Sequence, residues 1–353
     1  MNRTKLALAA LTASLLTSAA VAGVEPPFNT EGNVLIADQF NNRVIEIAPD
    51  GTIVWQFGRG PNDITAKSPV GVNDALRVGR RTLISGTGVP AGMEPLCPNG
   101  CADNRVMLVD EAGKIVWQYG RFGVTGSGPD QLNTPVQATW TDRHTVWITD
   151  QANQRAIEVN LHKKIVRQYG TTGVSGSGPN QLNNPNSVEV LDNGRLLIAD
   201  QNNNRAIEVD QAGNIVATFT IGGTASGVAF ASRLSNGDTL ITDSNNNRVV
   251  EVDSHDNIVW SYATNTQPGS NSNPLPTRAI RLKNNDTVIS DQFNHRVIEI
   301  DHNKKIVKQY GTLNVAGYST ISARKLLNAP YDAKIIGENR GLTFSSSLHL
   351  YPS

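Results

Sequence analysis

The feature that most constrains this chain is a repeated phrase: an Asp, an Asn three residues later, an Arg two residues beyond, and then a short alternating apolar run. Clear copies begin at Asp38, Asp150, Asp200, Asp243 and Asp291, and a degenerate copy begins at Asp103. The copies recur about every 50 residues, a period typical of four-stranded propeller blades. Six such units account for nearly all of the 353 residues, so we expect one domain.

A single unit contains four short strands and leaves no room for a helix. In the unit that follows Pro185, residues 186–190, 195–199, 206–209 and 214–219 alternate or run apolar, with Gly, Asn or Asp at the turns between them. Each unit leaves apolar faces that only a neighbouring unit can cover. We therefore expect an all-β, six-bladed β-propeller of four-stranded antiparallel blades.

The two ends of the chain are expected to share one blade. The first unit lacks a recognisable first strand. In later units a Leu-Asn-x-Pro segment, here called the lead-in, precedes the first strand at residues 132–135 and 182–185, and residues 327–330 repeat it. Residues 331–336 should therefore complete the first blade beside residues 34–57, which removes an exposed sheet edge. Residues 342–346 resemble another second strand and have no place in this scheme.

The first 22 residues read as a secretory signal peptide. Lys5 follows Arg3, residues 6–16 are apolar, and residues 20–22 form a small-residue cleavage site. The propeller domain then spans residues 23–353, and we expect it to be periplasmic or secreted. No later apolar run approaches the roughly 18 residues that a membrane span needs.

Charge and cysteine content narrow the possible functions. The net charge is zero and charged residues make up 18% of the chain, which disfavours nucleic-acid binding. The two cysteines, Cys97 and Cys101, favour a disulfide in an oxidising compartment over a metal pair without a nearby His.

The repeats resemble those of the NHL family. The resemblance rests on the lead-ins GVTGSGPDQLNTP and GVSGSGPNQLNNP, on the phrases VWITDQANQR and LLIADQNNNR, and on the repeat ends IVWQYG and IVRQYG. It covers most of residues 30–337 and implies a propeller, usually six-bladed. Members of the family include scaffolds, protein and RNA binders and a few enzymes, so the fold alone does not specify the function.

Two enzyme groups on similar propellers can be compared with these residues. Peptide-amidating and virginiamycin-type lyases use histidines around a metal near the channel, but here four histidines fall in turns on the other face: His144, His162, His255 and His302. Only His295 lies in a repeated phrase, so that metal centre does not carry over. Gluconolactonase-like propellers bind a divalent cation through Glu, Asn and Asp, and this pattern stays open. No cofactor is predicted, and calcium or another divalent cation is possible.

Strand direction places the repeated phrases, the glycine-rich lead-ins and the cysteine loop on one face, here called the Asp-Asn-Arg face. It is the default binding surface, because long loops surround the channel mouth there. In the second unit the phrase is replaced by Ser85-Gly86-Thr87 and an insertion from Gly88 to Asp103. This loop is a candidate lid or partner contact, or a decorated loop.

The repeated Asp and Arg favour a structural role over a ring of ligands, because a catalytic site is asymmetric. The Asp at the end of the second strand should accept turn N–H groups and pair with the Arg. The residues concerned are Asp38, Arg43, Asp150, Arg155, Asp200, Arg205, Asp243, Arg248, Asp291 and Arg296.

The innermost strands differ from unit to unit and are expected to line the channel. Counting two residues past each lead-in proline, or its equivalent position, gives Gly71 in the second unit and Gly227 in the fifth. The polar candidates for ligand binding are Gln137, Ser187, Glu189, Arg278, Asp332 and Lys334. They could pair with one another and with water, grip a small polar or anionic ligand through Arg278 and Lys334, or hold a cation through Glu189 and Asp332.

These observations favour an exported binding or scaffolding module for an exported protein or a small polar ligand. The alternative is an extracytoplasmic enzyme, a metal-assisted lactone hydrolase or lyase at the channel. The sequence contains no identifiable nucleophile and base pair to support it.

Overall fold

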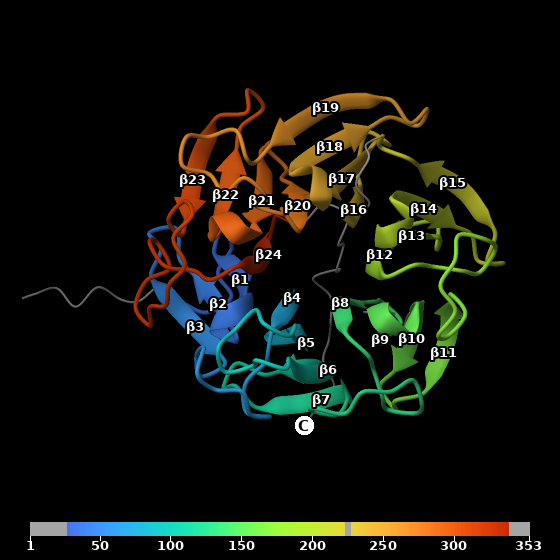
Figure 1. The fold of residues 1–353 in the computed structure, drawn as a ribbon, viewed down its shortest axis with the longest axis horizontal. Helices are drawn as coiled ribbons and strands as arrows, with labels where there is room; N and C mark the ends of the chain where they lie inside the picture. Colours follow the sequence, from blue (N-terminus) through green and yellow to red (C-terminus); the bar gives the residue numbers. More distant parts are fainter. Residues whose placement is uncertain (1–26, 223–226, 339–353) are drawn as a thin grey trace, which may run out of the picture.

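A computed structural model describes residues 27–222 and 227–338, which form six four-stranded antiparallel sheets in a ring (Figure 1). This confirms the expected six-bladed β-propeller. In each blade one strand lies nearest the centre of the ring. These innermost strands are β24, β4, β8, β12, β16 and β20. The predicted signal peptide and residues 342–346 lie outside the described residues. Within the described part of the chain, no helix is long and apolar enough to cross a membrane.

The first blade is built from both ends of the chain, and the other five follow in sequence order. The first blade contains β24 (Pro330–Ile335), β1 (Val34–Asp38), β2 (Arg43–Ile47) and β3 (Ile53–Phe57). The second contains β4 (Val72–Val78), β5 (Arg81–Val89), β6 (Cys101–Val109) and β7 (Ile115–Gly120). The third contains β8 (Pro135–Trp140), β9 (Thr145–Asp150), β10 (Arg155–Asn160) and β11 (Ile165–Tyr169).

The remaining three blades repeat this pattern. The fourth contains β12 (Pro185–Val190), β13 (Leu196–Asp200), β14 (Arg205–Val209) and β15 (Ile215–Phe219). The fifth contains β16 (Val228–Arg233), β17 (Thr239–Asp243), β18 (Arg248–Val252) and β19 (Ile258–Ala263). The sixth contains β20 (Arg278–Arg281), β21 (Thr287–Asp291), β22 (Arg296–Ile300) and β23 (Ile306–Tyr310).

Ring closure occurs where β24 pairs with β1. The two strands are antiparallel, with Val34 opposite Ile335 and Ile36 opposite Ala333. The prediction that the C-terminal strand completes the first blade is therefore confirmed. The pairing covers the edge of β1 that would otherwise be free, and β24 becomes the innermost strand of the first blade.

The hydrophobic core lies between the blades. Successive residues of a strand point to opposite faces of the sheet. In the first blade, Ile36 and Ile45 accordingly pack against the sixth blade, whereas Leu35 and Val44 pack against the second. Both faces of this blade are thus buried, which is why β1 (VLIAD) is apolar up to its final Asp.

The repeated Asp and Arg pair within their own blade. The Nε atom of each Arg lies 2.7–2.8 Å from an Asp oxygen in all five clear copies. The other oxygen of Asp150 accepts a hydrogen bond of 2.8 Å from the Asn133 backbone N–H, and Asp38 does the same for Asn328. The phrase therefore fixes its own lead-in to the end of the second strand.

In five of the six phrases the residue before the Arg accepts a hydrogen bond from the lead-in of the next blade. It adopts the left-handed conformation, which Asn tolerates well, with φ of 49° at Asn42 and 53° at His295. The side chain of Asn42 accepts a hydrogen bond from Gly71 N (2.9 Å), and His295 Nδ1 accepts one from Ala329 N (3.1 Å). Nδ1 of His295 must therefore be unprotonated, and burial lowers the pKa of this imidazole.

Candidate functional site

One residue from each innermost strand occupies the same register toward the centre of the ring. In four blades these are Gln137, Ser187, Arg278 and Asp332, as the sequence count indicated. In the second and fifth blades the count was wrong: Pro69 precedes the equivalent position by five residues instead of two, and the fifth lead-in contains no proline.

The strand pairing gives the correct residues in those two blades. Asp74 pairs with Ser85 and Phe230 with Thr242, as Asp332 pairs with Ala37. Asp74 and Phe230 thus replace Gly71 and Gly227, which lie three residues earlier in the chain. Asp74 is a charged channel residue that sequence counting missed.

Four charged side chains from three blades meet near the centre of the ring. Arg278 Nη2 lies 2.6 Å from Asp74 Oδ1, and Arg278 Nε lies 2.9 Å from Asp332 Oδ1. Lys334 Nζ lies 2.8 Å from Asp74 Oδ1 and also contacts Asp332. All four side chains are 5% exposed or less, and their charges balance. We call this group the four-charge network.

The four-charge network is satisfied mainly by its own members. Burial opposes ionisation of Asp332, but Arg278 and Lys334 outweigh it and hold the pKa of Asp332 below its usual value. The guanidinium of Arg278 also lies 4.0 Å from the ring centroid of Phe230. Among the described residues, Arg278 Nη1 is a buried donor without a hydrogen-bond partner. The network thus leaves one donor available.

The other predicted channel residues join neighbouring blades. Gln137 Oε1 accepts a hydrogen bond from Val188 N (2.8 Å), Ser187 Oγ one from Ala231 N (3.2 Å), and Glu189 Oε2 one from Arg233 N (3.0 Å). Burial raises the pKa of Glu189 to about 8, so this side chain is mostly protonated at neutral pH. It is a buried acid able to give or take a proton near neutrality.

Amide side chains form two hydrogen-bonded chains at the channel mouth on the Asp-Asn-Arg face. Gln292 donates to Gln39 (2.7 Å), and Gln39 donates to Asn73 (2.8 Å). Gln151 and Asn186 each donate 3.1 Å hydrogen bonds to Gln201. Sequence reasoning missed this lining, although Gln follows the repeated Asp in four units and was the available signal.

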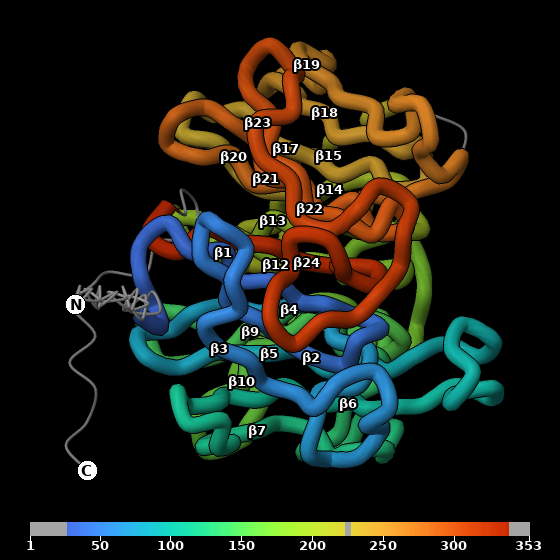
Figure 2. The backbone as a smooth tube through the Cα atoms, turned by 90° about the vertical axis from the view of Figure 1, so that its left-hand side faces the viewer, coloured from blue at the N-terminus to red at the C-terminus, as the bar shows by residue number. Residues whose placement is uncertain are grey.

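The second-blade insertion forms a hairpin that projects from the same face (Figure 2). Its strands β5 and β6 have nine residues each, and the predicted Cys97–Cys101 disulfide is confirmed. Its base packs in an apolar cluster that includes Phe40 and Val70. Its tip exposes Met93 (43%) and Leu96 (50%). We call residues 88–101 the second-blade hairpin.

The described residues contain no group of three or more His, Cys, Asp or Glu side chains that could hold a metal ion. His144 lies between β8 and β9, and His162, His255 and His302 lie between the third and fourth strands of their blades, as predicted. These turns are on the face opposite the second-blade hairpin.

Comparison with known proteins defines the class of this chain as a propeller. No protein-family model matches it, and no curated protein matches its sequence. The structure resembles virginiamycin B lyase from Staphylococcus aureus, at 17% identity, 81% and 82% coverage of the two chains and a TM-score of 0.53.

Two further solved structures have the same fold. One is a protein of unknown function from Bacteroides caccae, at 14% identity, 83% and 97% coverage and a TM-score of 0.56. The other is a streptogramin B lyase, at 14% identity, 80% coverage of each chain and a TM-score of 0.53. At these identities the likeness shows a propeller fold alone, and the number of six blades comes from the sheets of this chain.

Proposed function

We propose that this chain is an exported NHL-type propeller that binds a protein partner through the Asp-Asn-Arg face. The observation that carries the proposal is the second-blade hairpin, which presents Met93 and Leu96 to solvent on a disulfide-closed tip. Exposed apolar side chains on an ordered projection are typical of interaction surfaces.

The surroundings of the hairpin support a protein ligand. The amides at the channel mouth carry both donors and acceptors, which suits the main chain of a peptide. The charges deeper in the channel are already paired with one another, so they offer less to a charged ligand. A partner that inserted between the hairpin and the mouth would bury apolar and polar surface together.

The test is the affinity of a partner isolated by cross-linking to the chain from its native envelope. The variant Met93→Ser/Leu96→Ser should bind roughly 10- to 100-fold more weakly, because two partly exposed apolar side chains lose their buried contact. The matched control is Val216→Ser/Val259→Ser, which changes side chains 45% and 54% exposed on β15 and β19. Equal affinity for wild type and the hairpin variant would contradict the proposal.

A second candidate function is a hydrolase or lyase with its site in the channel. It is favoured by Glu189, whose pKa of about 8 suits a general acid or base. A divalent cation would be needed for the metal-assisted form of this chemistry. Stoichiometric metal retained after dialysis and lost in Glu189→Ala or Asp332→Ala would support it, whereas a folded, metal-free protein would favour the binding module.

A further inference from the structure

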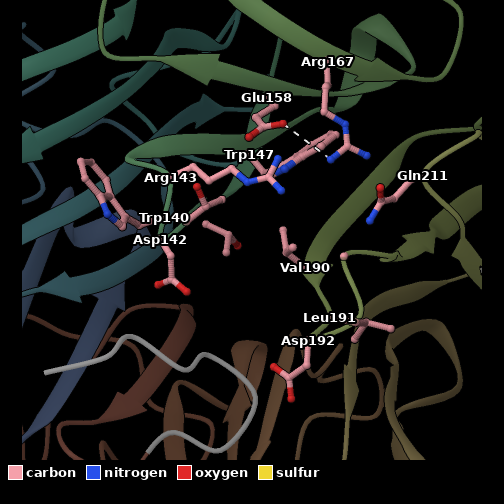
Figure 3. Close-up of a pocket in the computed structure, with 13 residues that line it drawn as sticks. Trp140, Asp142, Arg143, Trp147, Glu158, Arg167, Val190, Leu191, Asp192 and Gln211 are labelled. Carbon is pink, nitrogen blue, oxygen red and sulfur yellow. Dashed lines mark ion pairs between the residues drawn. The ribbon is translucent and has the colours of Figure 1, made fainter. Parts of the chain in front are cut away.

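A cleft of about 300 Å³ lies between the third and fourth blades, on the face opposite the second-blade hairpin (Figure 3). Trp147, Glu158 and Arg167 line it from the third blade, and Val190 and Asp192 line it from the fourth. Its volume is at the lower end of the roughly 300–1,000 Å³ found for small-molecule pockets. This cleft is separate from the repeated Asp-Asn-Arg phrases and from the centre of the ring.

At three other blade interfaces an arginine occupies the corresponding space. The three arginines are Arg77, Arg233 and Arg281, and each lies two residues after an alanine of the innermost strand. Each forms an ion pair with a glutamate on the third strand of the preceding blade. The Nη2–Oε2 distances are 2.6 Å for Arg77–Glu46, 2.8 Å for Arg233–Glu208 and 2.7 Å for Arg281–Glu251. Each guanidinium carbon also lies 5.0–5.5 Å from an aromatic ring centroid, of Trp55, Phe219 and Trp260 respectively. The interface is therefore built to receive a guanidinium group.

Between the third and fourth blades the glutamate remains but the arginine is replaced by Val190. Glu158 is only 4% exposed, and its Oε1 accepts a 2.5 Å hydrogen bond from Thr145 Oγ1. Arg167 Nη1 lies 3.8 Å from Oε2, beyond hydrogen-bond distance. Within residues 27–222 and 227–338, Oε2 therefore accepts no hydrogen bond, although it lies within ion-pair distance of Arg167.

The other two interfaces without this arginine are compensated differently. Between the second and third blades, Leu108 replaces the glutamate and Trp140 the arginine, so the contact is apolar. Between the sixth and first blades, Ile335 replaces the arginine, but Lys308 Nζ lies 2.9 Å from Glu299. The combination of a retained glutamate, a lost arginine and an open cleft marks the third-to-fourth interface.

The surroundings of Glu158 favour a cation. The Trp147 indole is a buried part of the cleft wall, and the guanidinium carbon of Arg167 lies 5.3 Å from its ring centroid. This wall therefore already holds one guanidinium group. Asp142 and Asp192 stand at the two turns that border the cleft (Figure 3). With Glu158 they outnumber the two lining cations, Arg143 and Arg167.

We propose that this cleft binds an external arginine side chain, carried by a peptide or by a small arginine derivative. Its guanidinium takes the position that the blade arginine holds in the three equivalent interfaces, against Glu158, while Arg167 keeps its place over Trp147. The site is independent of the partner surface proposed for the opposite face.

Isothermal titration with Nα-acetyl-arginine amide tests the proposal, and the citrulline analogue serves as its uncharged isostere. The wild-type chain should bind the arginine probe saturably and the citrulline probe at least ~10-fold more weakly, because a charge-assisted hydrogen bond is lost. Glu158→Gln should weaken arginine binding by a similar factor. Glu111→Gln, which removes an exposed carboxylate at the edge of the second blade, should bind as wild type does.

Val190→Arg is the decisive variant, because it restores the blade arginine and should fill the cleft from within. It should abolish binding of the arginine probe. Should this variant not fold, Val190→Ile, which copies Ile335 at the sixth-to-first interface, reduces the cleft by volume alone and should also weaken binding. The proposal is overturned if wild type binds neither probe, binds both equally, or binds as tightly after Glu158→Gln.

Discussion

Replacing Lys334 by Met tests whether the four-charge network stabilises the closed ring. Methionine keeps most of the aliphatic length but removes the ammonium group, so Asp74 and Asp332 must share Arg278 alone. The carbonyl of Ala75 also loses a donor at 2.8 Å. Removing one partner from a buried ionic group costs about 3–5 kcal/mol, because the remaining charge is uncompensated. We expect the free energy of unfolding to fall by that amount.

Urea denaturation of the mature chain at neutral pH measures this loss. The matched control is Arg80→Met, because the Arg80–Glu111 pair is 66% and 44% exposed and should contribute less than about 1 kcal/mol. The double variant Asp332→Asn/Lys334→Met restores charge balance and should lose less than the sum of the two single variants. A loss for Lys334→Met no larger than that for Arg80→Met would refute the reasoning.

Three further predictions concern single groups. The folded pKa of Glu189, about 8, lies above its ordinary 4.5, so wild-type stability should fall as pH rises between these values. Urea titrations at pH 5 and 9 should therefore find Glu189→Gln more stable than wild type only at the higher pH, by on the order of 3–5 kcal/mol, and a pH-independent difference would contradict this. Burial depresses the pKa of His295, so wild type should lose stability as pH falls below 6.5. His295→Asn places the Asn of the first unit at this position and should not show this loss when thermal unfolding temperatures are compared at pH 8 and pH 5. An equal fall in unfolding temperature for the variant and the wild type would count against the prediction. Cys97→Ser/Cys101→Ser should cost about 2 kcal/mol or less in urea, because the disulfide closes a short loop, and loss of the whole fold would show that the hairpin does more than predicted.

The blade number and the ring closure could be predicted because both are written as repeats. The Asp and Arg of each clear copy of the phrase pair five residues apart, and residues 327–330 copy an earlier lead-in. The spacing of residues within and between repeats was therefore enough to predict the blade number and the ring closure.

The channel could be predicted only in part. Arg278, Asp332 and Lys334 were expected beside it, but Asp74 was missed because the second lead-in departs from the common pattern. Arg278 and Asp74 are 204 residues apart, and only the ring brings them together. The cleft beside Glu158 was likewise invisible, because the substitution of an arginine by Val190 has meaning only after the blades are aligned by their strand pairing.

The closure of the ring by β24 is the claim on which every site in this account depends, because it sets which face and which blades each residue occupies. Nuclear Overhauser contacts in the perdeuterated chain measure it directly. The account predicts cross-strand contacts linking residues 34–37 to residues 332–335, with Ile36 opposite Ala333. Contacts of residues 332–335 with another strand, or none with residues 34–37, would contradict it.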